Sequence, residues 1–463
     1  MKVETKFVIY LIFVVGVVMR IMLLFQPNDM WHDASFTYLF SQEPVSYILD
    51  SNDVHPPLYT LFMKLMISMS SNEFFIRATT LITYIAFFFV LYKFLKKNCS
   101  SLTTLITLVL ISLSPTMILY SIEPRNYMLG MVFVIAQVFF FKTYLETGDT
   151  KQGYFYVLFS ILMLYTHYFT VFVLVVEGLY LLYKHRLKLM TIFLEAFILI
   201  GFLSIPLIIY FLRTLPKVHS MWFKDITLIS FISTLSYQLF PPDTLSSAHA
   251  IFFILFICLW IASFRLKHHP IFHYMMFFIP VVIVWAISQI HPLYHHRFFL
   301  FYSWAFYILI AQVIEIYIQN KKWNWIAYIF GGVLVTLLFI SFLGLPATLP
   351  TELNEAQQQL KNVLDKDSKY AFIHQSPFSQ TPMKYYFRDW KTFHFLNTTL
   401  TKKQRFTAGG SVIKDWEILN SNDKVYCYDG CIFVEAKANQ IFDADDIIYY
   451  DNGGLIVYGR KRT

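Results

Sequence analysis

The feature that most constrains this chain is a series of apolar runs, each of roughly 20 residues, that recurs up to residue 346. A helix needs about 20 apolar residues to cross the hydrocarbon core of a bilayer. Of the 463 residues, 57% are hydrophobic and 14% are charged, whereas a soluble domain carries about 25% charged residues. The pattern predicts an α-helical polytopic membrane protein and excludes both a soluble enzyme and a disordered chain.

These runs predict about 11 to 13 transmembrane helices. The expected segments are 6–25, 74–95, 101–120, 126–145, 154–166, 168–183, 189–212, 248–266, 271–290, 298–318 and 323–345. The two segments between 154 and 183 are the least regular, because two short pieces meet at Thr166-His167. Together the segments predict a transmembrane catalytic domain over residues 1–346.

Basic residues between the segments indicate how the chain is oriented. With the N-terminus in the cytoplasm, every dense basic cluster falls on the cytoplasmic side, where Lys and Arg are normally in excess. The clusters are Lys93/Lys96/Lys97, Lys142/Lys151, Lys184/Arg186/Lys188, Arg265/Lys267 and Lys321/Lys322. The formal charge of +8 is therefore expected to set the topology in the cell membrane rather than to bind nucleic acid.

One apolar run does not fit this topology as a membrane crossing. Residues 57–70 are too few to cross a bilayer, and they include Lys64. We expect this run to form a helix that lies at the outer membrane interface. Residues 26–73 then form one large first outer loop.

The composition changes after Pro346 and Pro350. Residues 351–463 alternate polar segments with short apolar runs that are typical of strands, preceded by a polar, helix-like stretch. The runs are Tyr370–His374, Lys424–Tyr428, Cys431–Glu435, Ile447–Tyr450 and Gly454–Tyr458, and the helix-like stretch is Glu352–Leu364. This predicts a small α/β domain, which the topology places on the extracytoplasmic side.

The four cysteines of the chain are too scattered for a disulfide framework or a zinc site. Only Cys427 and Cys431 are close in sequence, where they flank a Tyr-Asp-Gly turn. A disulfide across this turn and a pair of reduced strand residues are both compatible with the spacing.

Polar residues collect at the predicted outer boundary of the membrane, in segments far apart in the sequence. Asp33 follows the first membrane segment, and Arg125 and Arg297 lie at the ends of later segments. A carboxylate can accept a proton from an acceptor hydroxyl or hold a metal ion. A guanidinium binds phosphate through two parallel hydrogen bonds. These groups in a lipid-accessible site indicate group transfer from a lipid phosphate.

Each of these residues also has a simpler interpretation. An arginine near the membrane boundary often extends to the lipid head groups, and His167 lies in aromatic surroundings where histidines are often packed. The three histidines within residues 291–297 could bind a metal ion, although their spacing matches no zinc pattern. Asp53 and Glu43 are expected on the surface of the first outer loop.

Short motifs follow one another along the outer segments in a distinctive order. They are Trp31-His32-Asp33-Ala34, His55-Pro56-Pro57-Leu58-Tyr59, Arg77, the run Tyr120-Ser121-Ile122-Glu123-Pro124-Arg125-Asn126-Tyr127, Thr166-His167-Tyr168 and Arg297. Motifs in this order resemble those of the GT-C glycosyltransferases, in the branch of the protein O-mannosyltransferases and aminoarabinose transferases. The resemblance covers about residues 1–320 and implies a GT-C-like fold.

The resemblance also implies roles for individual residues. Asp33 would be the principal catalytic carboxylate, and Glu123 a second acidic residue of the active site. Residues that would bind substrate are His55, Tyr59, Arg125, Tyr127, His167 and Arg297, with the two arginines as candidates for the donor phosphate. The donor would be a polyprenyl-phosphate sugar, and the acceptor a lipid, a glycan or a protein.

One position departs from the family pattern. The residue after the first aspartate is usually glutamate in relatives and is Ala34 in this chain. A divalent metal ion therefore stays an open question as a cofactor. No other cofactor is implied.

Two other classes of function are compatible with many apolar segments. A transporter or flippase of a lipid or small solute would be expected to have two related halves and polar residues at the membrane midplane. No internal repeat is visible, and the polar residues gather at one boundary. An assembly protein would recruit a partner through its tail and would not bring Asp33, Glu123 and Arg125 together.

Overall fold

The computed structural model describes most of the helical part of the chain and several short segments of the tail. The described residues are 3–26, 29–51, 53–184, 187–218, 227–241, 247–264, 271–291 and 293–349, then 370–374, 385–386, 393–397, 407–408, 411–412, 431–436, 447–451 and 455–460. The chain divides into two compact units. The first is Met1–Phe25 with Ser46–Thr348, and the second is Gln26–Val45 with Leu349–Thr463. The segment that follows the first helix thus groups with the tail.

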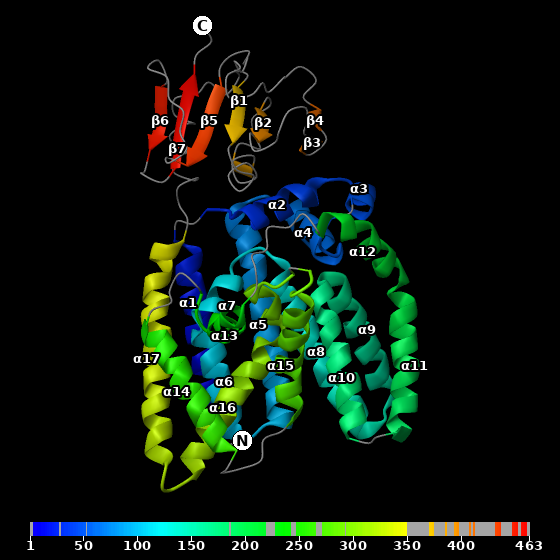
Figure 1. Cartoon of the computed structure of the whole chain (residues 1–463), viewed down its shortest axis with the longest axis vertical. Helices are drawn as coiled ribbons and strands as arrows, with labels where there is room; N and C mark the ends of the chain where they lie inside the picture. The colour runs from blue at the N-terminus through cyan, green and yellow to red at the C-terminus, as the bar shows by residue number, and fades with distance from the viewer. Residues whose placement is uncertain are drawn as a thin grey trace. The chain divides into compact units, whose positions relative to one another are not determined.

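The first unit is a bundle of α-helices (Figure 1). Its helices are α1 (Val3–Leu24), α3 (Val45–Asp50), α4 (Leu58–Met69), α5 (Glu73–Asn98), α6 (Ser101–Leu113), α7 (Pro115–Tyr120), α8 (Asn126–Thr147), α9 (Thr150–Thr166), α10 (Val171–Tyr183), α11 (Leu187–Leu203), α12 (Ile205–Val218), α13 (Leu228–Tyr237), α14 (Ser247–Ser263), α15 (Ile271–Ile287), α16 (Ser303–Gln319) and α17 (Asn324–Thr348). Two 3₁₀ helices, η1 (Tyr168–Thr170) and η3 (His296–Tyr302), precede α10 and α16. Each predicted apolar segment overlaps one of these helices or a consecutive pair.

Two of the predicted segments are broken into helix pairs. Proline has no backbone N–H and cannot continue the hydrogen-bond ladder of a helix. Pro115 separates α6 from α7, and Ser114 caps the new helix by accepting a hydrogen bond from the backbone N–H of Met117. A second break at Ser204, just before Pro206, separates α11 from α12, and the pair is bent by 52°.

Among the described residues, five helices are long and apolar enough to cross a membrane. They are Lys6–Leu24, Glu73–Asn98, Asn126–Thr147, His296–Gln319 and Asn324–Pro346, and the bent pair Phe193–Leu203 and Ile205–Thr214 is a sixth if it forms one span. Shorter apolar helices of 10–17 residues are Leu58–Met69, Ser101–Leu113, Tyr168–Tyr183, Phe253–Ser263 and Ile271–Ile287. The predicted count of 11 to 13 spans is not confirmed, because several apolar helices are shorter than the roughly 20 residues that a crossing requires.

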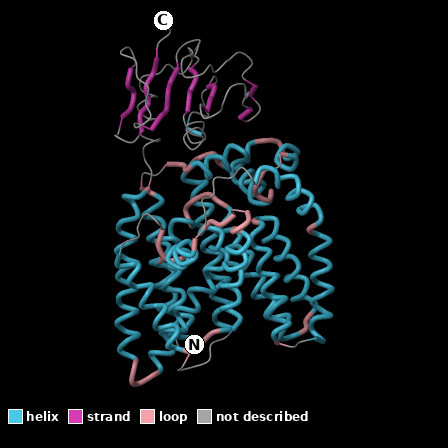
Figure 2. Tube along the Cα trace, viewed as in Figure 1, coloured by secondary structure: helices cyan, strands magenta, loops and turns pink. Residues whose placement is uncertain are grey.

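The centre of the first unit is the helix formed by η3 and α16. This span is 89% buried in its most apolar part, whereas the first and last spans are 33% buried. Helix α16 packs against α6, α15 and α17, while α8 packs along α5 and α9 as a second group. Figure 2 shows the same long helices running beside one another. The central helix carries the segment that follows Arg297, so this part of the sequence is positioned by contacts on all sides.

Several basic residues meet at one end of the bundle. The Nζ atom of Lys97, in the last turn of α5, lies 2.8 Å from Glu146 near the end of α8. The Nζ atom of Lys142 lies 4.0 Å from the ring centroid of Phe272 at the start of α15 and 4.9 Å from that of Tyr180 on α10. The ends of these helices therefore come together, as the predicted topology requires of the basic loops.

A buried arginine closes the helix break at Pro115. Arg20 on α1 is fully buried and donates hydrogen bonds to the carbonyl oxygens of Ser112 and Ile111, at 3.0 and 3.2 Å. These carbonyls lie in the last turn of α6, where Pro115 removes a backbone donor. The guanidinium also lies 3.5 Å from the ring centroid of Tyr84. Arg20 therefore caps a helix end in the interior of the bundle.

We expect Arg20→Leu to lower the free energy of unfolding by about 1–3 kcal/mol, because the carbonyls of α6 lose their donors in a buried environment. Thermal unfolding of the purified protein in detergent measures this change. Arg213→Leu is the matched control, since Arg213 on α12 is exposed. Equal loss of stability in both variants would contradict the capping role.

The second unit combines the N-terminal helix α2 (His32–Gln42) with strands of the tail. Its strands are β1 (Tyr370–His374), β2 (Phe393–Asn397), β3 (Thr407–Ala408), β4 (Ser411–Val412), β5 (Cys431–Ala436), β6 (Ile447–Asp451) and β7 (Leu455–Arg460). Five of them form a sheet of order β2-β1-β5-β7-β6. Strand β1 is parallel to both of its neighbours, β2 and β5, whereas β7 is antiparallel to both of its neighbours, β5 and β6. Strands β3 and β4 form a separate antiparallel pair. Parallel neighbours require crossover connections.

Strands lie at four of the five positions predicted in the tail. The polar stretch 352–364, the apolar run 424–428 and Cys427 lie outside the described residues. Helix α2 contacts the tail through two tyrosines. The backbone N–H of Met30 donates to the hydroxyl of Tyr386 at 2.7 Å, and the rings of Tyr38 and Tyr385 meet edge to face at 4.8 Å.

Candidate functional site

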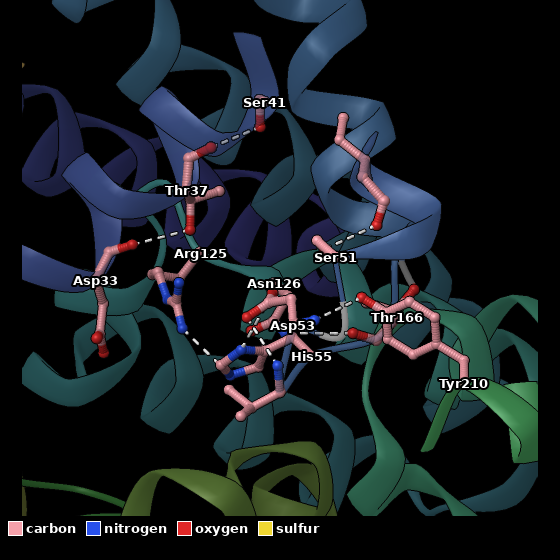
Figure 3. A network of polar contacts seen from close by, with 12 residues as sticks. Asp33, Thr37, Ser41, Ser51, Asp53, His55, Arg125, Asn126, Thr166 and Tyr210 are labelled. Carbon is pink, nitrogen blue, oxygen red and sulfur yellow. Dashed lines mark hydrogen bonds and ion pairs between the residues drawn. The ribbon is translucent and has the colours of Figure 1, made fainter. Parts of the chain in front are cut away.

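Four nitrogen-bearing side chains from distant parts of the sequence meet in the first unit. They are His55 before α4, Arg125 at the start of α8, His167 after α9 and Arg297 in η3. The Nη2 atom of Arg125 lies 3.4 Å from Nε2 of His55 (Figure 3). The rings of His55 and His167 are 5.9 Å apart, and the charge of Arg297 acts on His167. We call these residues the cationic cluster.

Prolines position two members of the cluster. Pro56 and Pro57 follow His55 and lead into α4, where their fixed φ angles suit a helix start. Pro124 lies in the bend between α7 and α8, and Arg125, which follows it, has an extended conformation with φ −130° and ψ 162°. The side chain of Asn126 then donates to the carbonyl of Thr166 at 3.2 Å, which ties the start of α8 to the end of α9.

His167 presents a hydrogen-bond donor within the cluster. Its Nδ1 accepts from the backbone N–H of Phe169 at 3.2 Å, so the proton of the neutral ring is on Nε2. Nε2 is buried and has no hydrogen-bond partner among the described residues. Burial, and then the charges of His55, Arg125 and Arg297, lower the pKa of His167 well below its usual value. The ring is therefore neutral at physiological pH.

Aromatic rings enclose the cluster on one side. The ring of His167 lies 4.7 Å from that of Phe301, which is 5.9 Å from Tyr127. Tyr127 meets Tyr120 edge to face at 5.1 Å, and the hydroxyls of Tyr120 and Tyr237 are 2.5 Å apart. Packing of His167 against aromatic rings, the simpler interpretation of this residue, is thus also observed. These rings form an aromatic enclosure on one side of the cluster.

Tyr59 and Glu123 lie close to the same cluster. Burial raises the pKa of the Tyr59 hydroxyl; the charge of Arg125 opposes this shift and that of Glu123 adds to it. The carbonyl of Glu123 accepts a hydrogen bond from the backbone N–H of Arg125 at 2.7 Å. The carboxylate and the guanidinium therefore come from a single bend between α7 and α8. The structure brings seven of the predicted site residues together in the first unit: His55, Tyr59, Glu123, Arg125, Tyr127, His167 and Arg297.

Asp33 belongs to the second unit, in the first turn of α2. Its backbone carbonyl accepts from the Thr37 hydroxyl at 2.9 Å, and the carbonyl of Thr37 accepts from Ser41 at 2.6 Å (Figure 3). Each of these hydroxyls thus donates to the backbone carbonyl four residues earlier in α2. A carboxylate in the first turn also interacts favourably with the helix dipole. The local structure accordingly holds Asp33 on a regular helix.

The expectation that Asp53 lies on the loop surface is wrong. Its side chain is 11% exposed, and Oδ2 lies 3.9 Å from Nδ1 of His55. The backbone N–H of Asp53 donates to the Tyr210 hydroxyl on α12 at 3.0 Å (Figure 3). Its position two residues before a motif histidine is a signal that could have indicated this contact.

Tyr237 is a residue of the enclosure that the sequence did not single out. It ends α13, and its carbonyl accepts from the hydroxyl of Thr116 at 2.8 Å. No motif marks α13, because it is short and comes from a weakly patterned part of the chain. Its place beside Tyr120 depends on the fold alone.

A metal site formed by the histidines within residues 291–297 is not supported. The described residues contain no group of three His, Cys, Asp or Glu side chains that could hold a metal ion. The Nδ1 atom of His296 instead lies 2.9 Å from the Thr234 hydroxyl.

A glycine on α8 leaves room for the aromatic enclosure. A Cβ atom on Gly130 would lie 2.5 Å from Cε1 of Phe301, whose side chain is fully buried. We expect Gly130→Ala to lower the free energy of unfolding by about 1–3 kcal/mol through overpacking. Gly178→Ala on α10 is the matched control, because nothing lies within 4 Å of its Cβ position. Thermal unfolding compares the two, and equal stability would show that Phe301 can move.

A protein-family model matches part of the chain. The family model for dolichyl-phosphate-mannose-protein mannosyltransferase matches residues 54–210, a stretch that includes His55, Arg125 and His167. No curated protein matches the sequence.

Solved structures match the fold over nearly the whole chain. ArnT from Cupriavidus metallidurans in the apo state has a TM-score of 0.62 at 10% identity, and the match covers 99% of this chain and 98% of that one. ArnT bound to undecaprenyl phosphate has a TM-score of 0.60 at 10% identity, covering 96% and 97%. The Archaeoglobus fulgidus oligosaccharyltransferase in complex with zinc and sulfate has a TM-score of 0.52 at 10% identity, covering 85% and 63%. The predicted resemblance to the GT-C glycosyltransferases is confirmed.

Proposed function

We propose that this chain, a membrane protein with the GT-C fold, transfers a sugar from a polyprenyl-phosphate donor to an acceptor on the extracytoplasmic face. The observation that carries the proposal is the cationic cluster, in which Arg125, Arg297, His55 and His167 converge. The undecaprenyl phosphate bound to ArnT, a structure of the same fold, is a ligand of this chemistry.

The position of the cluster suits a lipid head group. Arg125 precedes the first turn of α8, and the helix rise places Lys142 roughly 25 Å further along, near the thickness of a hydrocarbon core. Lys142 belongs to the end of the bundle where the basic residues meet. This spacing supports a position of the cluster at the opposite boundary, where a phosphate would stay in the interface while its lipid tail enters between helices.

The positive charges of the cluster are complementary to the negative charge of the departing phosphate. The phosphate of the donor is a diester with one negative charge, and it gains a second charge when the bond to the sugar breaks. Preorganised donors aimed at developing charge are a large source of catalysis in an enclosed site. Arg125 and Arg297 would hold the phosphate oxygens, and the Nε2–H of His167 adds a neutral donor.

The acceptor needs a base. In the proposed displacement, an acceptor oxygen forms a bond to the anomeric carbon while the carbon–oxygen bond to the phosphate breaks. The electron pair of the broken bond stays on the phosphate oxygen, and the acceptor proton moves to the carboxylate of Asp33. A single displacement of this kind inverts the configuration of the sugar. Glu123 would help to orient the acceptor or to balance the charge of Arg125.

Transfer of label from a panel of polyprenyl-phosphate sugars tests the proposal. The full chain, reconstituted in nanodiscs, is incubated with each labelled donor and an acceptor extract of lipids, glycans and proteins. We expect labelled product with at least one donor. In proteoliposomes, movement of the intact donor between leaflets without any product would instead identify a flippase.

A further inference from the structure

We infer that Asp53 is a positioning residue that sets the protonation of His55 within the cationic cluster. The expected kinetic effects rest on the proposed function, but the expected tautomer of the His55 imidazole does not. Among the described residues, the groups that face His55 include Asp53 from its own loop, Arg125 from the start of α8 and His167 from the end of α9.

Contacts with Arg125 and Asp53 favour the same tautomer of His55. A guanidinium has only donors, so its contact with Nε2 at 3.4 Å favours a lone pair on that atom. The proton of the neutral ring is then on Nδ1. Nδ1 faces Oδ2 of Asp53 at 3.9 Å, within the range of an ion pair. Asp53 thus lies where its charge favours a proton on Nδ1.

The loop that carries Asp53 is held at both ends. The Oδ1 atom of Asp53 accepts from the backbone N–H of Val54 at 2.8 Å, which orients the carboxylate. The backbone N–H of Asp53 donates to the Tyr210 hydroxyl at 3.0 Å, which ties the loop to α12. On the other side of His55, Pro56 and Pro57 limit the backbone. The carboxylate and the imidazole are therefore presented to each other by a constrained segment.

This arrangement has a consequence when a phosphate enters the cluster. Arg125 can then donate to the phosphate, which frees Nε2 of His55 to take up a proton from solvent. An imidazolium has an ordinary pKa of about 6.5, close to the second pKa of about 6 of a phosphate monoester. With Asp53 behind it, the imidazolium can donate from Nε2 to the phosphate oxygen as the second negative charge develops. His55 touches the phosphate, and Asp53 acts through His55.

Removal of the Asp53 charge should therefore move the pH profile. A nearby carboxylate raises the pKa of a histidine, so Asp53→Asn lowers the pKa of His55 and the active, protonated form is lost at lower pH. We expect the basic limb of kcat/KM to shift down by about one pH unit, which is about a tenfold loss on that limb. The acidic side of the profile should change by much less. A general loss of structure would instead reduce kcat/KM equally at all pH values.

The closing experiment reads the imidazole directly. The full chain is labelled with ¹⁵N at its histidine ring nitrogens and measured in lipid by solid-state NMR, with His55→Gln to assign the His55 signals. We expect a neutral Nδ1–H tautomer for His55 in the wild type and a growing Nε2–H population in Asp53→Asn. The matched control is Asp50→Asn, because Asp50 is exposed in α3. An Nε2–H tautomer in the wild type, or no change in Asp53→Asn, would overturn the inference.

The two readouts separate this inference from the proposed function. If the tautomer changes as expected but no donor yields product, the glycosyltransferase proposal fails and the role of Asp53 toward His55 stands. If product forms while the tautomer and the pH profile of Asp53→Asn stay as in the wild type, the glycosyltransferase proposal stands and the role of Asp53 toward His55 fails. Tyr210→Phe adds a second variant that keeps the carboxylate and removes only its tie to α12.

Discussion

Replacing Asp33 with asparagine is expected to reduce transfer by about 10²–10⁴-fold, the usual contribution of a general base. Asparagine has nearly the same shape but cannot accept the acceptor proton. The substitution retains the first turn of α2, where the Asp33 backbone carbonyl and not its side chain accepts from Thr37. The thermal unfolding temperature should therefore be unchanged, and the loss of activity should appear in kcat.

The control for Asp33 is the same chemical change elsewhere in the second unit. Glu43→Gln follows the end of α2 and should transfer sugar at the rate of the wild type. Initial rates with saturating donor, measured for both variants, separate a catalytic role from a general effect of charge. Normal turnover in Asp33→Asn would remove the carboxylate from the mechanism.

Replacing Arg125 with glutamine should cost about 10²–10³-fold in kcat/KM, the usual loss when one charged donor to a developing anion is removed. Arg125 is 5% exposed, so its interaction with a bound phosphate is little screened by water. Arg125→Lys keeps the charge but loses the planar fork, and we expect it to recover only part of the rate. Binding of a polyprenyl phosphate should weaken in the same order.

Arg213→Gln provides the matched control for Arg125, because Arg213 is exposed on α12. It should leave both donor binding and transfer unchanged. Equal losses from Arg125→Gln and Arg213→Gln would indicate a general dependence on positive charge at the membrane surface. Full activity of Arg125→Gln would show that the cationic cluster is not the phosphate site.

Much of the helical architecture could be predicted because apolar runs report directly on burial in lipid. Most of the helices fall where these runs lie, except α2, α3 and α13, and the strands β1, β5, β6 and β7 fall on apolar runs predicted in the tail. The number of spans could not be predicted from the same signal. Pro115 and the break at Ser204 divide apolar segments, and hydropathy does not register a break inside an apolar run.

The members of the cationic cluster could also be predicted, because their motifs lie at helix ends that the topology puts on one side. The motif histidine at position 55 and the arginine at 125 are 3.4 Å apart as a result. The same reasoning was not applied to Asp53, although its place two residues before the motif histidine is a signal for the contact with His55. The burial of Asp53 depends on Tyr210, which lies far along the chain on α12.

The sequence by itself determined that this is a helical chain with membrane-spanning segments, which segments are apolar, and which charged residues lie at their ends. These properties are local, because the partition of each segment into lipid depends on its own side chains. Only the tertiary structure decided that Arg20 caps α6, that Tyr237 joins Tyr120, and that Asp53 faces His55. Such contacts either join residues that are remote in sequence or depend on the direction in which a side chain points. Their energies therefore depend on how the helices pack and not on any single segment.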